Sequence, residues 1–150
     1  MKSIFDKTTQ DELVSRINAL QTSTPAQWGK MNATQMLKHC TIFEEMVLGK
    51  NAKKHKQIWL GRLFGKIALR KLLKPDTIIG KNSPTLPEFI IKKTDGDLDE
   101  LKKLWLTLIE EYSRFSNTGF VHPFFGEMTA EQIGYFVYKH SDHHLRQFGV

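Results

Sequence analysis

The chain has 150 residues, of which 40% are hydrophobic and 25% charged, and its formal net charge at pH 7 is +6. This length and composition are typical of one soluble globular domain, residues 1–150, with a sizeable core. No apolar run is long enough to cross a membrane, so stable membrane insertion is not expected.

The first residues, "MKSIFDKTTQDE", turn polar and acidic. They lack the apolar stretch and the small-residue cleavage site of a signal peptide. Cys40 is the single cysteine, which excludes an internal disulfide and fits a reducing compartment. We therefore expect a cytoplasmic location.

Four helix starts can be recognised along the chain, each a capping residue followed three positions later by Glu or Gln. The pairs are Thr9 with Glu12, Asn32 with Gln35, Asp97 with Glu100, and Thr129 with Gln132. Each pair precedes an apolar pattern of helical period. The predicted helices span residues 9–21, 32–48, 97–117 and 129–148.

The long connection between the second and third predicted helices has its own character. Residues 53–74 form a predicted basic amphipathic helix that ends before Pro75. Its apolar side comprises Ile58, Trp59, Leu63, Phe64, Ile67 and Leu72. Residues 75–97 carry three of the five prolines and should run extended. The predicted fold is all-α, a four-helix bundle with a long crossover that contains this extra helix.

The last predicted helix carries three of the six histidines within five residues. At about 100° per residue, His140 and His144 continue an apolar stripe formed by Ile133 and Val137. His143 lies on the border of that stripe. The opposite side, expected to face solvent, carries Lys139, Asp142 and Arg146.

Histidines one helical turn apart can bind one metal ion, because their Cβ atoms lie about 5–6 Å apart and metal–nitrogen bonds are about 2.0–2.1 Å long. A third ligand should come from a facing helix. His39 lies at the edge of the apolar stripe of the second predicted helix. We therefore predict a metal site formed by His39, His140 and His144. Three histidines with open positions are typical of catalytic metal sites.

Other interpretations remain open for these residues. A histidine on an apolar face is more often a hydrogen-bonded core residue than a ligand. His143 competes with His140 as a ligand or forms hydrogen bonds outside the metal's ligand set, and Gln147 can orient a ligand or a water. We expect His122 not to ligate, His55 to be solvated among lysines, and Cys40 to pack in the core.

Three segments carry a family resemblance: "WGKMNATQMLKHC" at 28–40, "HPFFGEMT" at 122–129 and "YKHSDHHLRQFG" at 138–149. Together they resemble the DinB/YfiT-like superfamily of metal-binding four-helix bundles, in a branch known mainly as a domain of unknown function. The resemblance spans essentially the whole chain. It implies a divalent metal site at His39, His140 and His144, and it implies thiol-dependent chemistry such as an S-transferase or isomerase reaction.

Ligation by imidazole alone favours zinc or nickel. A small-molecule thiol substrate would be activated as a thiolate and attack an electrophile. Alternatively, water would be activated and the reaction would be a hydrolysis. No motif selects a general base among the available acids. These acids are Glu44, Glu110, Glu111 and Asp142.

A second class of function depends on the basic helix at 53–74. Such a helix can lie on an anionic membrane or meet nucleic-acid phosphates. No nucleic-acid motif accompanies it, so a nucleic-acid partner is not expected. We favour packing of its apolar side on the bundle, with the charges solvated. A homodimer formed through a helix is a lesser alternative. The cations of this helix are Lys53, Lys54, Lys56, Arg62, Lys66, Arg70, Lys71 and Lys74.

Overall fold

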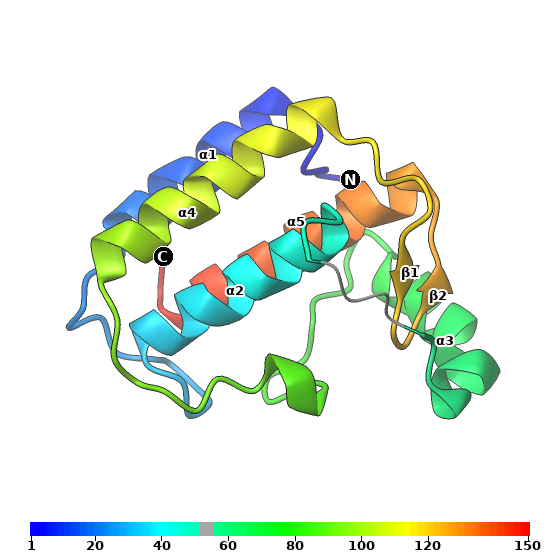
Figure 1. Cartoon of the computed structure of the whole chain (residues 1–150), viewed down its shortest axis with the longest axis horizontal. Coiled ribbons are helices and arrows are strands. Elements are labelled where there is room, and N and C mark those ends of the chain that lie inside the picture. Colours follow the sequence, from blue (N-terminus) through cyan, green and yellow to red (C-terminus); the bar gives the residue numbers. More distant parts are fainter. Residues whose placement is uncertain (52–55) are drawn as a thin grey trace.

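The computed structural model describes residues 1–51 and 56–150 and is mostly helical, which confirms the predicted helical class (Figure 1). The α-helices of these residues are α1 (Lys7–Ala19), α2 (Ala33–Val47), α3 (Trp59–Leu72), α4 (Leu98–Glu111) and α5 (Ala130–Gln147). Two 3₁₀ turns, η1 (Pro87–Phe89) and η2 (Tyr112–Arg114), complete the helical structure. Residues 53–55 of the predicted basic helix, His55 among them, lie outside the described residues.

The helix starts follow the capping pattern at α2, α4 and α5. Asn32 and Gln35 form a reciprocal capping box before α2, and Thr129 and Gln132 form another before α5. At α4 the Asp97 carboxylate accepts hydrogen bonds from two backbone N–H groups of the first turn. These contacts satisfy donors that the helix itself leaves unpaired.

The start predicted for the first helix is wrong by two residues. Helix α1 begins at Lys7, and Thr9 is buried within its first turn instead of capping it. The N-terminal segment turns back on itself, because the Asp6 N–H donates to the Ser3 carbonyl and the Asp6 side chain accepts from the Ser3 N–H. This turn sets the helix start upstream of the Thr9 pattern.

Helix α4 is also shorter than predicted. Helix α4 ends at Glu111 instead of residue 117 and tightens into η2. A small antiparallel hairpin follows, with β1 (Val121–His122) paired to β2 (Gly126–Glu127). The His122 Nδ1 accepts hydrogen bonds from the N–H groups of Phe124 and Phe125, so this ring shapes the hairpin turn.

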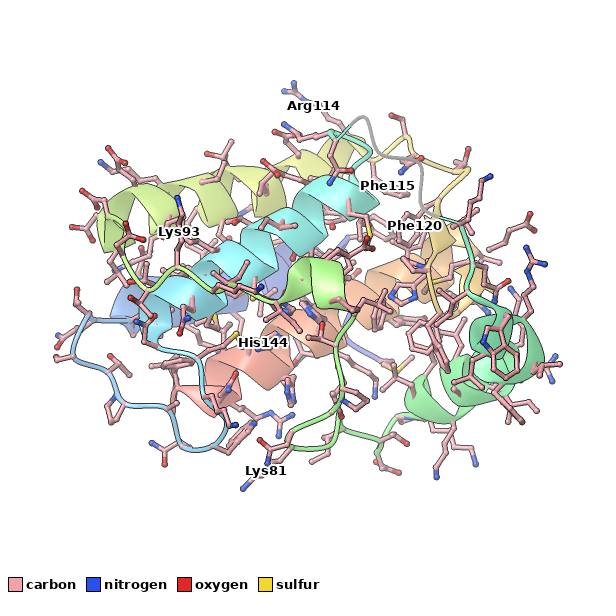
Figure 2. All side chains as sticks on the ribbon, turned by 60° about the horizontal axis from the view of Figure 1, so that its bottom comes forward. Lys81, Lys93, Arg114, Phe115, Phe120 and His144 are labelled. Atoms are coloured by element: carbon pink, nitrogen blue, oxygen red, sulfur yellow. The ribbon has the colours of Figure 1, made fainter. Side chains whose placement is uncertain are left out.

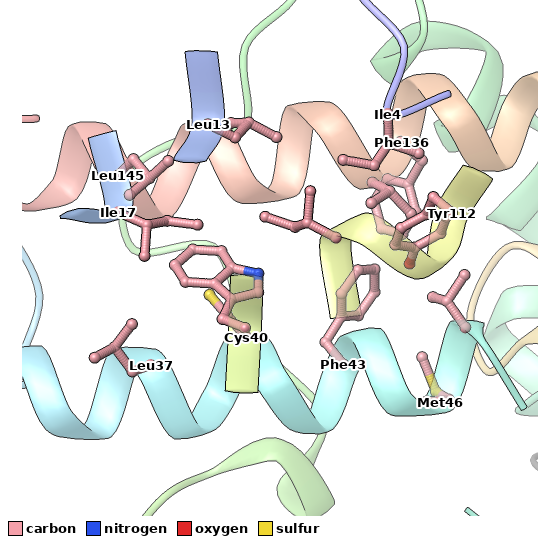
Figure 3. Close-up of a cluster of buried hydrophobic side chains, with 14 of the residues drawn as sticks. Ile4, Leu13, Ile17, Leu37, Cys40, Phe43, Met46, Tyr112, Phe136 and Leu145 are labelled. Carbon is pink, nitrogen blue, oxygen red and sulfur yellow. The ribbon is translucent and has the colours of Figure 1, made fainter. Parts of the chain in front are cut away.

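Four helices enclose the core. Helix α2 packs on α4 and α5, and α1 also packs on both α4 and α5 (Figure 1). The buried side chains between them come from all four helices and from the turns beside them (Figure 3). Cys40 is fully buried in this cluster, as expected for a packing residue. Other members are Leu13, Ile17, Leu37, Phe43, Trp105, Ile109, Phe136 and Leu145.

Helix α3 lies at one end of the molecule beside the hairpin (Figure 1). Our expectation that its apolar side packs on the bundle is wrong. Trp59 is 72% exposed and Leu63 is 60% exposed, whereas the buried positions are Gly61, Gly65 and Leu69. A Cβ at either glycine would overlap with the Phe124 carbonyl oxygen. The helix therefore approaches the hairpin through its smallest residues.

The crossover from α3 to α4 is anchored by polar side chains. The Lys139 ammonium on α5 donates to the backbone carbonyls of Lys74 and Thr77, and the Gln35 amide donates to the Ile91 carbonyl. Lys139 is consequently buried, although its position on the helix predicted a solvent-facing side chain. The crossover covers the face of α5 that the sequence pattern assigned to water.

Candidate metal centre

His39 on α2 and His140 and His144 on α5 meet at one point. Each ring offers one nitrogen, and these three atoms all lie within 4.8 Å of one another. The Nε2 atoms of His39 and His140 are 3.3 Å apart. Figure 2 locates His144 on α5 among the surrounding side chains. The structure thus brings together the three histidines that the sequence pattern selected, and this cluster can hold a metal ion.

The helices place these rings by simple periodicity. His140 and His144 are one turn apart on α5, and their ring centroids are 4.7 Å apart. The His39 ring on α2 is also 4.7 Å from the His144 ring. Because both helices begin at capping boxes and bury apolar stripes against each other, the register between the two histidine positions is fixed by the core.

The tautomer of His39 follows from its hydrogen bond. Its Nδ1 lies 3.0 Å from the Phe89 carbonyl oxygen in η1. A carbonyl only accepts, so the Nδ1 of His39 carries the proton and a neutral ring holds its lone pair on Nε2. This outer hydrogen bond is the arrangement that metal-ligating histidines usually have.

Gln147 fixes the ring of His144 in the same manner. The Gln147 amide nitrogen donates to the Trp28 carbonyl at 2.9 Å, which leaves its amide oxygen as acceptor for the His144 Nδ1–H at 3.0 Å. The lone pair of His144 therefore lies on Nε2. Gln147 was predicted to lie near the ligand face, and the structure places it in direct contact with a candidate ligand.

The ring of His140 is held by packing. Its centroid is 3.9 Å from that of Phe43 and 6.2 Å from that of Phe136. Its Nδ1 is buried and has no hydrogen-bond partner among the described residues. The residue as a whole is less buried than His39 and His144.

All three rings are kept neutral by their surroundings. Burial lowers the pKa of His144 to about 3, and the neighbouring His39 adds to this effect. Burial lowers the pKa of His140 well below its usual value. It also lowers the pKa of His39, against the opposing effect of the hydrogen bond that His39 donates to the Phe89 carbonyl. Protons therefore do not compete for the ring nitrogens at neutral pH.

His143 lies beside this cluster without joining it. Its ring is 5.0 Å from the His144 ring and 5.7 Å from the Trp28 ring. It is buried, and burial lowers its pKa. Its Nδ1 has no hydrogen-bond partner within the part of the chain that the structure describes.

Three of the four candidate acids are engaged in other contacts. Glu44 is fully buried and accepts hydrogen bonds from Trp105, Tyr112 and Ser141, and burial raises its pKa to about 7. Asp142 pairs with Arg16 and Arg146. Glu111 pairs with Lys50, and Glu110 is exposed on α4.

Two contacts of the site lie beyond sequence reasoning. The acceptors that orient His39 and Gln147 are the backbone carbonyls of Phe89 and Trp28. A backbone carbonyl is present at every residue, so no residue type marks these positions. The Pro87 turn in the crossover is the one sequence feature that indicates backbone near α2, where the Phe89 carbonyl accepts from His39.

The chain belongs to a family described as a protein family of unknown function, DUF1569, whose profile matches residues 3–149. No curated protein and no solved structure gives a significant match to the chain. Within the described residues, none of the helices combines the length and apolar character needed to span a membrane.

Proposed function

We propose that this DUF1569 chain binds a divalent metal ion through His39, His140 and His144 and uses it in a reaction on a small molecule. The observation that carries the proposal is the convergence of three neutral ring nitrogens within 4.8 Å of one another. In two of these rings, an acceptor on Nδ1 leaves the lone pair on Nε2. Lone pairs gathered in this way repel one another unless a proton or a cation lies between them.

The donor set indicates the class of metal. Three imidazoles favour zinc or nickel over magnesium or calcium, which prefer oxygen ligands. An ion held by three protein ligands supplies Lewis acidity that lowers the pKa of a thiol or of water.

Thiol chemistry is the more specific form of the proposal, and its support is the resemblance of the three histidine-bearing segments to the DinB/YfiT-like superfamily. That resemblance also supports assigning α1, α2, α4 and α5 to a four-helix bundle with α3 in its crossover. The chain's own residues then act as follows. Gln147 and the Phe89 carbonyl hold two rings in one tautomer, and Phe43 packs against the third ring.

The competing interpretation is a cluster of core histidines. The 3.3 Å contact between His39 and His140 is short enough for one ring to donate to the other. In that arrangement the Nδ1 of His140 would be an acceptor left unpaired among the described residues, at a cost of about 1–3 kcal/mol. A metal ion removes the need for a shared proton but leaves the same Nδ1 to be satisfied.

The test is metal analysis of protein purified without a histidine tag. The parent and a variant with His39, His140 and His144 all changed to Ala would be compared after loading with zinc and with nickel. The parent should hold about one ion per chain, and the variant should hold none. Equal metal content in both proteins would contradict the metal site and support the interpretation of these residues as core histidines.

The thiol assignment needs a separate readout. Protein loaded with cobalt in place of the native ion would be titrated with a small thiol, and a new near-ultraviolet charge-transfer band is expected. The His143→Ala variant serves as the matched control, because it removes a histidine of the same helix that lies outside the cluster. Metal binding without a thiol-dependent band would support the metal site and contradict the proposed thiol substrate.

A further inference from the structure

Helix α3 exposes an unusual set of side chains for a helix of a small globular domain. Trp59, Leu63, Phe64 and Ile67 are 72%, 60%, 54% and 65% exposed, and Leu60 is 41% exposed. Residues 60, 63, 64 and 67 are spaced three and four apart, so they form one continuous stripe on the helix surface. Single exposed apolar residues are ordinary, but a contiguous stripe of large ones marks an interaction surface.

The stripe faces outward because the opposite side of α3 is occupied. Gly61 and Gly65 lie against the Phe124 carbonyl at the hairpin turn. The Gln57 amide donates to the same carbonyl at 3.0 Å, and the Ile58 N–H donates to the Pro123 carbonyl at 2.9 Å. The helix is thus fixed to the rest of the chain by these glycines, by the buried Leu69 and by hydrogen bonds to hairpin carbonyls, and its apolar stripe is left unburied.

Charge distinguishes among the partners that such a stripe would fit. Arg62, Lys66, Arg70 and Lys71 are exposed on α3. The sequence contains no Asp or Glu between Glu45 and Asp76. Large apolar side chains flanked by cations are the composition of helices that lie in the headgroup region of an anionic membrane.

A second copy of the chain fits this surface poorly. A symmetric contact through α3 would bring the same patch of each copy together, since two-fold interfaces are self-complementary. The cations of one helix would then face the cations of the other, with no acid on either helix to pair with them. Like charges brought together in this way oppose association.

We propose that α3 is a peripheral docking helix that lays its apolar stripe on an anionic lipid surface. Trp59, Leu63, Phe64 and Ile67 enter the headgroup region, while Arg62 and Arg70 meet the lipid phosphates. The Lys66 ammonium instead donates to the Glu127 carbonyl of the hairpin. The position of α3 at one end of the molecule allows this without burying the other helices (Figures 1 and 2). The proposal does not depend on the histidine cluster, which belongs to α2 and α5.

Co-sedimentation of the full chain with vesicles tests the proposal. Vesicles of phosphatidylglycerol and phosphatidylcholine in equal parts should bind the protein, and vesicles of phosphatidylcholine alone should bind it at least about 10-fold less. Binding should weaken as salt is raised, because counterions screen the cations. Trp59 fluorescence should shift to the blue on binding, and a Trp59→Phe variant should lose this shift.

Matched variants separate the stripe from general hydrophobicity. The double change Trp59→Ser and Phe64→Ser should reduce vesicle binding at least about 10-fold with an unchanged helical circular dichroism spectrum, since both side chains are exposed. The control changes Ile78 and Ile90 to Ser, because these residues are 63% and 54% exposed outside α3. This control should bind vesicles as the parent does.

Three results would overturn the proposal. The first is failure of the parent to bind anionic vesicles even at low salt. The second is vesicle binding by the α3 double variant that is as tight as that of the parent. The third result is a dimer in sedimentation equilibrium that the α3 double variant dissociates, with no vesicle binding by either protein. That third result would assign the stripe to a second copy of the chain.

Discussion

The last turns of α5 bury His143, His144 and Gln147, whereas α3 leaves Trp59 and Leu63 in solvent. Both helices are amphipathic, and in both the apolar period is evident in the sequence. In α5 the apolar stripe determines the orientation, so the polar residues that continue it are carried into the interior. In α3 the glycines determine the orientation instead, because only they allow the close approach to Phe124.

The comparison shows what a periodic pattern specifies. It groups residues onto one face of a helix, but the face that turns inward depends on what lies opposite. Helix α5 meets α1 and α2, which offer apolar side chains. Helix α3 meets the backbone of the hairpin turn at Gly61 and Gly65, where a Cβ does not fit. The following predictions test this difference, beginning with the largest effect.

Removal of a candidate ligand from α5 should have the largest effect. His140→Ala or His144→Ala should abolish stable metal binding, because each removes one of three ligands. The loss should exceed the roughly 10- to 100-fold loss that follows removal of an outer partner. Bound metal and the metal-dependent rise in melting temperature would be measured. Retention of metal by both variants would show that α5 buries its histidines for packing alone.

The buried carboxyl that contacts α5 should give the next largest effect, and its sign follows from its pKa. Burial raises the pKa of Glu44 from 4.5 to about 7, so the folded protein binds the proton more tightly than the unfolded chain does. The stability that this group contributes is therefore full below about pH 4.5 and is lost as pH rises to about 7. Glu44→Gln removes this dependence while keeping the shape of the side chain.

The free energy of unfolding of Glu44→Gln relative to the parent should thus rise by up to about 3 kcal/mol between pH 4.5 and pH 8, since one pKa unit is worth about 1.4 kcal/mol. Urea denaturation at both pH values measures this difference. Glu110→Gln is the control, because Glu110 is exposed on α4. A difference that stays constant with pH would mean that the carboxyl is not held neutral by the core.

Substitutions on the two faces of α3 should differ in their effect on the free energy of unfolding. Gly65→Leu should destabilise the protein by about 1–3 kcal/mol, because the new side chain would collide with the backbone of the hairpin. Ile67→Ser, on the exposed stripe, should change the free energy of unfolding by less than about 0.5 kcal/mol. Urea denaturation of both variants would decide. A larger loss from Ile67→Ser would place the stripe, and not the glycines, against the rest of the protein.

The features that depend on local sequence pattern could be predicted from the sequence. The capping boxes at Asn32 and Thr129 follow from spacing along single helices and are present in the structure. The apolar faces of two helices predicted that His39 would meet His140 and His144, and the three rings lie together. The start of α1 was missed because a tertiary turn at Ser3 and Asp6 replaced the local cap. The burial of Lys139 and the outward stripe of α3 were missed because each depends on a distant segment of backbone.

The smallest effect should come from His143, the histidine of α5 that adjoins the cluster without entering it. Its ring is 5.0 Å from the His144 ring, whereas Gln147 bonds directly to the Nδ1 of His144. Gln147→Ala should weaken metal affinity about 10-fold by freeing the His144 ring, at the lower end of the range for outer partners. His143→Ala should change the affinity less than Gln147→Ala does, because no hydrogen bond to a candidate ligand is lost. Competition with a metal indicator would rank the two variants. If His143→Ala empties the site while His140→Ala does not, α5 presents a different pair of histidines to the metal and the ligand assignment must change.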